Sequence, residues 1–270
     1  MDITFIGGGN MATALVGGLV AKGFDAKRIK VVEIVPDARQ RLAESFGVAC
    51  FGAPPAAAPY GDVVVLAVKP QQMREVATAI APHLRAELVL SIAAGIRLAD
   101  LGRWLGGYPR LARCMPNTPA LIGLGVTGLY ARPAVEPGQR SQAQAVLEAV
   151  SEVIWVDEEA LLDPVTAVSG SGPAYVFFFI EALERAASGL GIEAAAARRL
   201  AIATFRGAAE LAARSSEAPA TLRERVTSKG GTTERALAAM RADQIDQAIG
   251  RAVRAANERA RELGDELGRD

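Results

Sequence analysis

The stretch Met1-Asp-Ile-Thr-Phe-Ile-Gly-Gly-Gly-Asn-Met-Ala12 decides the fold expected for this chain. Residues 2–6 form a short alternating run, which predicts a buried strand, and three consecutive glycines follow it at once. From Asn10 onward apolar residues recur at about every fourth position, the period of a helix packed on a sheet. A strand, a glycine turn and a helix in this order predict half of a dinucleotide-binding unit.

The glycine turn has the pattern G-x-G-x-x-A, carried by Gly7, Gly9 and Ala12. Gly7 allows a tight turn, Gly9 lets the backbone approach a pyrophosphate, and Ala12 lets the helix pack close to the strand. Free N–H groups at the start of the helix, around Asn10 and Met11, would face the phosphates. The alternative explanation is a tight turn in an unrelated α/β fold.

Composition excludes several classes of protein. The chain has 270 residues with 30 basic and 30 acidic side chains, so it lacks the positive charge of a general nucleic-acid or anionic-membrane binder. Two distant cysteines (Cys50 and Cys114) and one histidine (His83) argue against a zinc site, and we expect no metal. The cysteines are expected to be free thiols in a cytoplasmic protein, and no apolar run is typical of a membrane span.

Strand and helix patterns alternate up to about Asp157, which predicts a doubly wound, mostly parallel Rossmann-like sheet. After that point only helical patterns rich in Ala, Leu, Glu and Arg remain. We therefore expect a dinucleotide-binding domain over residues 1–160 and an all-helical domain over residues 161–270. Apolar helices of this kind often need a partner surface, so we expect an oligomer. Beyond the first strand, the expected strands cover residues 29–33, 62–67, 87–91, 111–113, 126–130 and 153–156. Beyond the first helix, the expected helices cover residues 36–46, a segment that ends near residue 81, and residues 137–150, 161–168, 174–190, 193–214, 232–240 and 244–263.

Ligands of an open α/β sheet lie outside the carboxyl ends of its strands. The segments at those ends are Gly7–Met11, Glu33–Pro36, Ala67–Pro70, Ser91–Gly95 and Cys114–Pro119. Together they are expected to line a cofactor groove. The predicted cofactor-binding residues are Gly7, Gly9, Asn10, Met11, Ala67, Val68, Lys69, Pro70, Ala93, Ala94 and Asn117.

The spacing alone leaves the choice between NAD and NADP open. Glu33 falls where an acidic side chain could bind a ribose 2′-hydroxyl, which favours NAD. Arg39 and Arg41 follow closely and could instead accept a 2′-phosphate, which favours NADP. Both arginines could equally well be solvated on the face of a helix.

Two further glycine-rich stretches, residues 167–175 and 226–237, lie in or near the helical region. The first fits either a functional turn or a connection between helices with small residues for close packing. In the second, Gly230 and Gly231 precede the start of a helix, whose N–H groups and positive end suit a carboxylate. An ordinary threonine N-cap with Glu234 in the first turn is the alternative there.

Several motifs resemble the pyrroline-5-carboxylate reductase family. They run in order along essentially the whole chain: Ile-Gly-Gly-Gly-Asn-Met-Ala at 6–12, Ala-Val-Lys-Pro at 67–70, Met-Pro-Asn-Thr-Pro at 115–119, Ser-Gly-Ser-Gly-Pro-Ala-Tyr at 169–175 and Val-Thr-Ser-Lys-Gly-Gly-Thr-Thr at 226–233. The resemblance implies a Rossmann-like domain followed by an all-α dimerisation domain. It also implies reduction of 1-pyrroline-5-carboxylate to L-proline, the last step of proline biosynthesis, with NADP(H) or alternatively NAD(H).

The same resemblance implies the roles of individual residues. The substrate would lie against Ser228, Gly230, Gly231, Thr232 and Thr233, with the last three holding its carboxylate through their N–H groups. Thr233 is the implied catalytic residue, because its hydroxyl would hydrogen-bond the ring nitrogen. The family further implies a homodimer, or a higher oligomer built from dimers.

Two other functions compete with this one. A dehydrogenase of the hydroxyacid type also joins a Rossmann domain to a helical one, but it would carry a lysine on the first long helix, and residues 174–190 contain none. A non-catalytic nucleotide-binding regulatory module would have no need for an anion site at Gly230–Thr233.

Overall fold

The computed structural model describes residues 1–269. Internal contacts divide the chain into two compact units. Unit 1 comprises Met1–Ser171 together with the chain from Ala256 onward, and unit 2 is Gly172–Ala255. The last helix, α11 (Ile245–Leu267), contributes residues to both units. The domain boundary expected near residue 160, between residues 1–160 and 161–270, stays a prediction.

Unit 1 is built on one eight-stranded sheet with the order β3-β2-β1-β4-β5-β6-β7-β8. Neighbouring strands are parallel except for the antiparallel pair β6 and β7. The prediction of a doubly wound, mostly parallel sheet is therefore confirmed. The strands are β1 (Ile3–Ile6), β2 (Ile29–Val32), β3 (Ala49–Phe51), β4 (Val63–Leu66), β5 (Leu88–Ser91), β6 (Leu111–Met115), β7 (Gly125–Ala131) and β8 (Ser151–Trp155).

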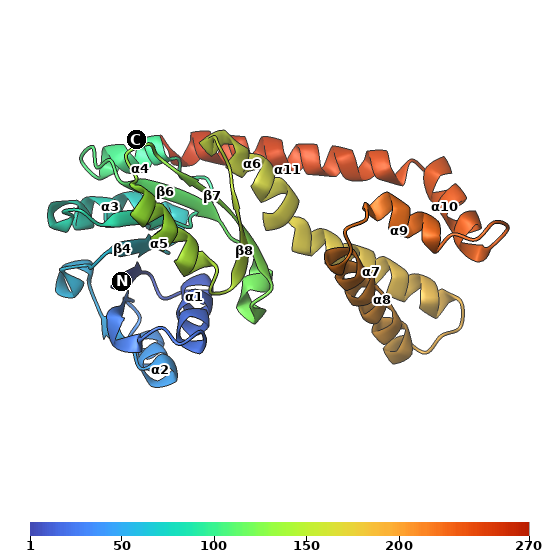
Figure 1. Cartoon of the computed structure of the whole chain (residues 1–270), viewed down its shortest axis with the longest axis horizontal. Coiled ribbons are helices and arrows are strands. Elements are labelled where there is room, and N and C mark those ends of the chain that lie inside the picture. The colour runs from blue at the N-terminus through green and yellow to red at the C-terminus, as the bar shows by residue number, and fades with distance from the viewer. Residues whose placement is uncertain (270) are drawn as a thin grey trace. The chain divides into compact units, whose positions relative to one another are not determined.

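Helices cover both faces of this sheet (Figure 1). Alternate residues of β4 show why its sequence is continuously apolar: Val63 and Val65 pack into the core with α1, α2 and α5, whereas Val64 and Leu66 pack into the core with α3 and α4. The helices of unit 1, besides the end of α11, are α1 (Asn10–Ala21), α2 (Pro36–Phe46), α3 (Met73–Ile80), α4 (Leu98–Trp104), α5 (Pro137–Leu147) and α6 (Leu162–Val165).

A buried ion pair holds α6 and the segment before it against the sheet. The side chain of Arg113 on β6 is only 5% exposed, and its guanidinium lies 3.2 Å from Glu159 Oε1 and 3.9 Å from Asp163 Oδ1. Glu159 Oε1 also accepts a hydrogen bond of 2.7 Å from the N–H of Leu98 at the start of α4. The positive charge of Arg113 thus offsets the negative charges of two acidic side chains at the end of the sheet region.

Replacing Arg113 by methionine should lower the free energy of unfolding by about 3–5 kcal/mol, because Glu159 and Asp163 would lose their shared cation inside the protein. Urea unfolding measures this loss. Arg110→Met is the control, since Arg110 lies 3.8 Å from an exposed Glu136 and its pair should contribute only about 0–1 kcal/mol. Equal losses in the two variants would contradict the importance assigned to the buried pair.

The described residues of unit 2 form helices joined by turns and short irregular segments, without a strand. Its helices are α7 (Gly172–Gly189), α8 (Ala194–Arg214), α9 (Pro219–Arg225), α10 (Thr232–Ala242) and the first part of α11. On α8 only Ala197 and Ala201 are buried, whereas Phe177 and Phe178 of α7 are 60% and 62% exposed. Unit 2 therefore carries apolar surface that one chain leaves open. Among the described helices, none is both long enough and apolar enough to cross a membrane.

Candidate active site

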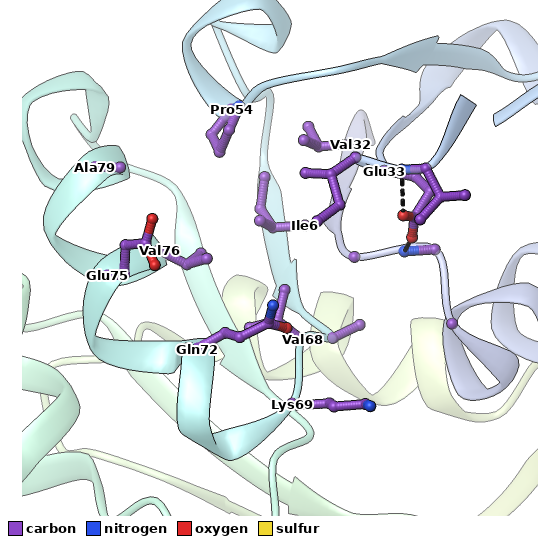
Figure 2. A pocket seen from close by; sticks show the side chains of 16 residues that line it. Ile6, Val32, Glu33, Pro54, Val68, Lys69, Gln72, Glu75, Val76 and Ala79 are labelled. Carbon is purple, nitrogen blue, oxygen red and sulfur yellow. Dashed lines mark hydrogen bonds between the residues drawn. The ribbon is translucent and has the colours of Figure 1, made fainter. Parts of the chain in front are cut away.

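A groove of about 430 Å³ lies at the carboxyl ends of β1, β2 and β4 (Figure 2). The chain order of the sheet reverses between β1 and β4, which is where doubly wound sheets bind ligands. Three turns form much of the groove, and α3 with the segment before it closes another side. The lining residues are Ile6–Gly9, Val32–Val35, Pro54, Ala67–Lys69, Gln72, Glu75, Val76 and Ala79.

The three glycines after β1 meet different demands. Gly7 has φ +105°, and a Cβ there would lie 2.6 Å from the carbonyl oxygen of Ala67, so no other residue fits. A Cβ on Gly8 would lie 2.7 Å from Leu42 Cδ1 on α2. A Cβ on Gly9 would meet no atom within 4 Å. Gly7 is thus required by the protein's own backbone, a side chain at Gly8 would require Leu42 to shift, and Gly9 presents bare backbone to open space.

Glu33 connects the turn after β2 to the glycine turn. Its Oε2 accepts a 2.9 Å hydrogen bond from the N–H of Gly8, and its Oε1 accepts one of 2.9 Å from the N–H of Val35. Arg39 on α2 donates through Nη1 to the carbonyl oxygens of Glu33 and Ile34, at 2.7 and 3.0 Å. Glu33 lines the groove (Figure 2). Nη1 of Arg39, in contrast, is bound to the backbone.

The structure brings together only some of the predicted cofactor-binding residues. Gly7, Gly9, Ala67, Val68 and Lys69 line the groove. The others lie outside its lining: Asn10 and Met11 in the first turn of α1, Pro70 at the start of a 3₁₀ turn, Ala93 and Ala94 after β5, and Asn117 after β6. The role of each residue toward a cofactor stays a prediction.

Both ends of the Asn117 side-chain amide form hydrogen bonds within the protein. Asn117 is only 8% exposed, donates to the carbonyl oxygen of Ser169 at 3.1 Å, and accepts from the N–H of Val126 at 3.0 Å. The Met-Pro-Asn-Thr-Pro motif is thereby tied to the Ser-Gly-Ser-Gly stretch. That stretch continues a π-helical turn (Thr166–Gly170), in which a Cβ on Gly170 would lie 2.8 Å from Met115 Cε. A side chain at Gly170 would therefore require the flexible end of Met115 to shift.

Part of the groove was not predicted from the sequence. Pro54 and the α3 side contribute lining residues, and Gln72, Val76 and Ala79 among them are spaced at helical intervals. That spacing was visible in the sequence. It could point to a ligand only once the helix was known to flank the glycine turn.

The second candidate site is the start of α10 in unit 2. Gly231 is the N-cap residue, and no side chain caps the helix, so the alternative of a threonine N-cap is not realised. Glu234 instead accepts a 2.7 Å hydrogen bond from the N–H of Gly230, which has φ +77°. The N–H of Gly231 donates to the carbonyl oxygen of Ser228 at 3.0 Å. Of the three N–H groups expected to hold a carboxylate, that of Gly231 is thus already bonded within the turn.

The first turn of a helix leaves its N–H groups without intrahelical acceptors, and the helix dipole favours an anion there. Thr232 and Thr233 occupy these positions in α10. Thr232 is exposed and Thr233 is partly buried. This end of α10 can therefore offer two backbone donors and two hydroxyl groups to a small carboxylate.

Comparison with known proteins assigns the family. A family profile described as pyrroline-5-carboxylate reductase dimerisation matches residues 159–263, and one described as NADP oxidoreductase, coenzyme F420-dependent, matches residues 2–95. A pyrroline-5-carboxylate reductase of Pseudomonas aeruginosa is 45% identical over 98% of this chain and 98% of its own length. The chain belongs to the pyrroline-5-carboxylate reductase family.

Solved structures of this reductase family agree. The pyrroline-5-carboxylate reductase of Coxiella burnetii superposes with a TM-score of 0.93 at 40% identity, covering 97% of this chain and 98% of that one. The Plasmodium falciparum pyrroline carboxylate reductase, solved with NADP bound, gives 0.85 at 26% identity and 98% coverage of both chains. The predicted architecture, a Rossmann-like domain followed by an all-α dimerisation domain, is confirmed.

Membership of this reductase family also decides between the competing functions. The chain is an oxidoreductase, so the non-catalytic regulatory module is not supported. A hydroxyacid-type dehydrogenase is not supported either, because the relatives that match over nearly the full length are named pyrroline-5-carboxylate reductase. The dimerisation profile over residues 159–263 supports an oligomer, in line with the exposed apolar side chains of unit 2.

Proposed function

We propose that this chain reduces 1-pyrroline-5-carboxylate to L-proline, as the last step of proline biosynthesis, with a reduced nicotinamide dinucleotide as hydride donor. The observation that carries the proposal is the 45% identity, over 98% of the chain, to the pyrroline-5-carboxylate reductase of Pseudomonas aeruginosa. NADP(H), with NAD(H) as the alternative, is the cofactor that the family description favours.

The groove in unit 1 fits a dinucleotide. A bound nicotinamide cofactor would supply the hydride at its C4 atom. The protein binds and orients this cofactor. The bare backbone of Gly9 lets the pyrophosphate come close, and the first-turn N–H groups of Asn10 and Met11 bind the pyrophosphate oxygens. The remaining predicted contacts, from Ala67–Pro70, Ala93, Ala94 and Asn117, belong to this proposal as well.

The start of α10 is proposed to hold the substrate. The N–H groups of Thr232 and Thr233 bind its carboxylate, while Ser228, Gly230 and Gly231 shape the turn that presents them. The hydroxyl of Thr233 hydrogen-bonds the ring nitrogen, which orients the imine carbon for hydride transfer. A threonine hydroxyl is a poor acid near neutral pH, so water or a preformed iminium supplies the proton.

The assignment of roles follows the expected division of the chain. Residues 1–160 bind the dinucleotide, and residues 161–270 bind the substrate and form the dimer. A homodimer is the proposed assembly, with a higher oligomer of dimers as its extension. We also propose a cytoplasmic location, in keeping with two cysteines that are free thiols in the structure.

The test is an assay of the purified protein with 1-pyrroline-5-carboxylate and each reduced cofactor in turn. Loss of nicotinamide absorbance, with proline identified by mass spectrometry, is the expected result. A hydroxyacid and its ketoacid serve as control substrates and should give no turnover. Absence of turnover with both cofactors would contradict the proposed function.

A further inference from the structure

We propose that Glu33 makes this chain prefer NADH to NADPH, by accepting hydrogen bonds from the adenosine ribose and repelling a 2′-phosphate. The inference rests on the proposed use of a nicotinamide dinucleotide. It goes beyond the family assignment, which leaves the identity of the group on the ribose to the residues at the end of β2.

The place of Glu33 follows from the connectivity of a dinucleotide. The adenosine ribose is joined directly to the pyrophosphate, so it must lie next to the turn that binds the pyrophosphate. Glu33 lines the groove at that turn and holds the N–H of Gly8 at 2.9 Å. The carboxylate is therefore fixed beside the ribose before any ligand arrives, which is the position of ribose-binding acidic residues in NAD-dependent Rossmann domains.

The carboxylate has acceptor capacity left for the ribose. Two carboxylate oxygens offer about four acceptor positions. The N–H groups of Gly8 and Val35 take one position on each oxygen. A position on each oxygen thus remains for a ribose hydroxyl, which can donate. A 2′-phosphate carries roughly two negative charges and no strong donor near neutral pH, so it would be repelled at the same place.

The residues next to Glu33 in the chain carry no cation. Ile34 and Val35, which follow Glu33, are apolar and 67% and 50% exposed. Nη1 of Arg39 donates to two backbone carbonyl oxygens. Among the described residues that line the groove, Lys69 is the only basic one, and Figure 2 shows it apart from Glu33, after β4.

The experiment compares NADH and NADPH by calorimetric Kd and by kcat/KM in wild type, Glu33→Gln and two controls. Wild type should prefer NADH by about tenfold or more, the size of one charge-assisted hydrogen bond. Glu33→Gln removes the charge and keeps an acceptor for only one of the Gly8 and Val35 N–H groups, so most of the preference should disappear. Glu44→Gln makes the same change on α2 outside the groove, where Glu44 accepts from Gln40, and should keep the wild-type ratio.

The second control, Glu75→Gln, removes a negative charge from the α3 side of the groove. If it relaxed the preference as much as Glu33→Gln does, the general charge of the groove would be responsible and the inference would fail. Equal or tighter binding of NADPH by wild type would also overturn it.

A further variant, Ile34→Arg, adds a cation at an exposed position and leaves Glu33 in place. It should raise the affinity for NADPH by about tenfold relative to NADH. An unchanged ratio of the NADH and NADPH Kd values would contradict the inference, and this test remains if Glu33→Gln does not fold. The ratio of the two cofactor Kd values is measured without substrate, so it does not depend on the proposed function. Preferential NADH binding without turnover would contradict the proposed function and leave the inference about Glu33 intact.

Discussion

Replacing Gly9 by valine is expected to abolish dinucleotide binding in a protein that still folds. Gly9 has φ −69° and ψ −177°, an extended conformation that valine adopts readily, and a Cβ there meets no atom of the protein within 4 Å. The new side chain would fill the space in which the backbone must meet the pyrophosphate. We expect the Kd for the cofactor to rise at least about 100-fold, or roughly 2.7 kcal/mol.

Calorimetry with both cofactors measures this loss, and urea unfolding checks that the fold is kept. Gly7→Ala is the contrasting variant: with φ +105° and a contact of 2.6 Å to the Ala67 carbonyl oxygen, it should lose stability as well as binding. If Gly9→Val bound a dinucleotide as tightly as wild type, the groove would not be the cofactor site.

The sequence predicted best those elements whose ends are defined by local chemistry. Helix α2 spans Pro36–Phe46 as expected, because a proline opens it and Gly47, with φ +70°, ends it. Strands β4 and β5 were found because they are buried on both faces and hence continuously apolar.

Three elements were missed for a common reason, which is that they are too short to show a period. Strand β3 (Ala49–Phe51) has three residues, none of them buried, and helices α4 (Leu98–Trp104) and α9 (Pro219–Arg225) are seven residues long. Such segments form because the surrounding tertiary structure holds them, as α4 is held by packing of Leu98 and Leu101 in the core.

The candidate site was only partly predictable, because the type of a polar residue does not reveal which hydrogen-bond partner it has in the folded chain. Glu33 and Arg39 supported opposite cofactors in the sequence, and only the structure shows Glu33 lining the groove and Arg39 Nη1 bound to backbone carbonyl oxygens. Likewise, whether Gly231 or a threonine caps α10 depends on backbone torsion angles, and the structure places the cap at Gly231.

Replacing Thr233 by alanine is expected to lower kcat by about 10- to 100-fold, the cost of losing one hydrogen bond to a group that becomes charged during the reaction. The fold should be unaffected, because Thr233 is not the N-cap of α10 and its N–H group is retained. Cofactor affinity should also be unchanged, since the proposed contact is with the substrate. Steady-state kinetics with 1-pyrroline-5-carboxylate, alongside cofactor binding, separates these effects.

Matched variants isolate the hydroxyl of Thr233. Thr233→Ser keeps the hydroxyl and should restore most of the turnover, whereas Thr232→Ala makes the same deletion one residue earlier, where the proposed contact is through the backbone, and should have a small effect. Wild-type turnover in Thr233→Ala would remove the assigned role. The dependence of kcat on pH then distinguishes two ways of acting: a hydroxyl that only orients the ring nitrogen leaves the profile in place when deleted, whereas one that relays the proton shifts it, because another group must then supply that proton.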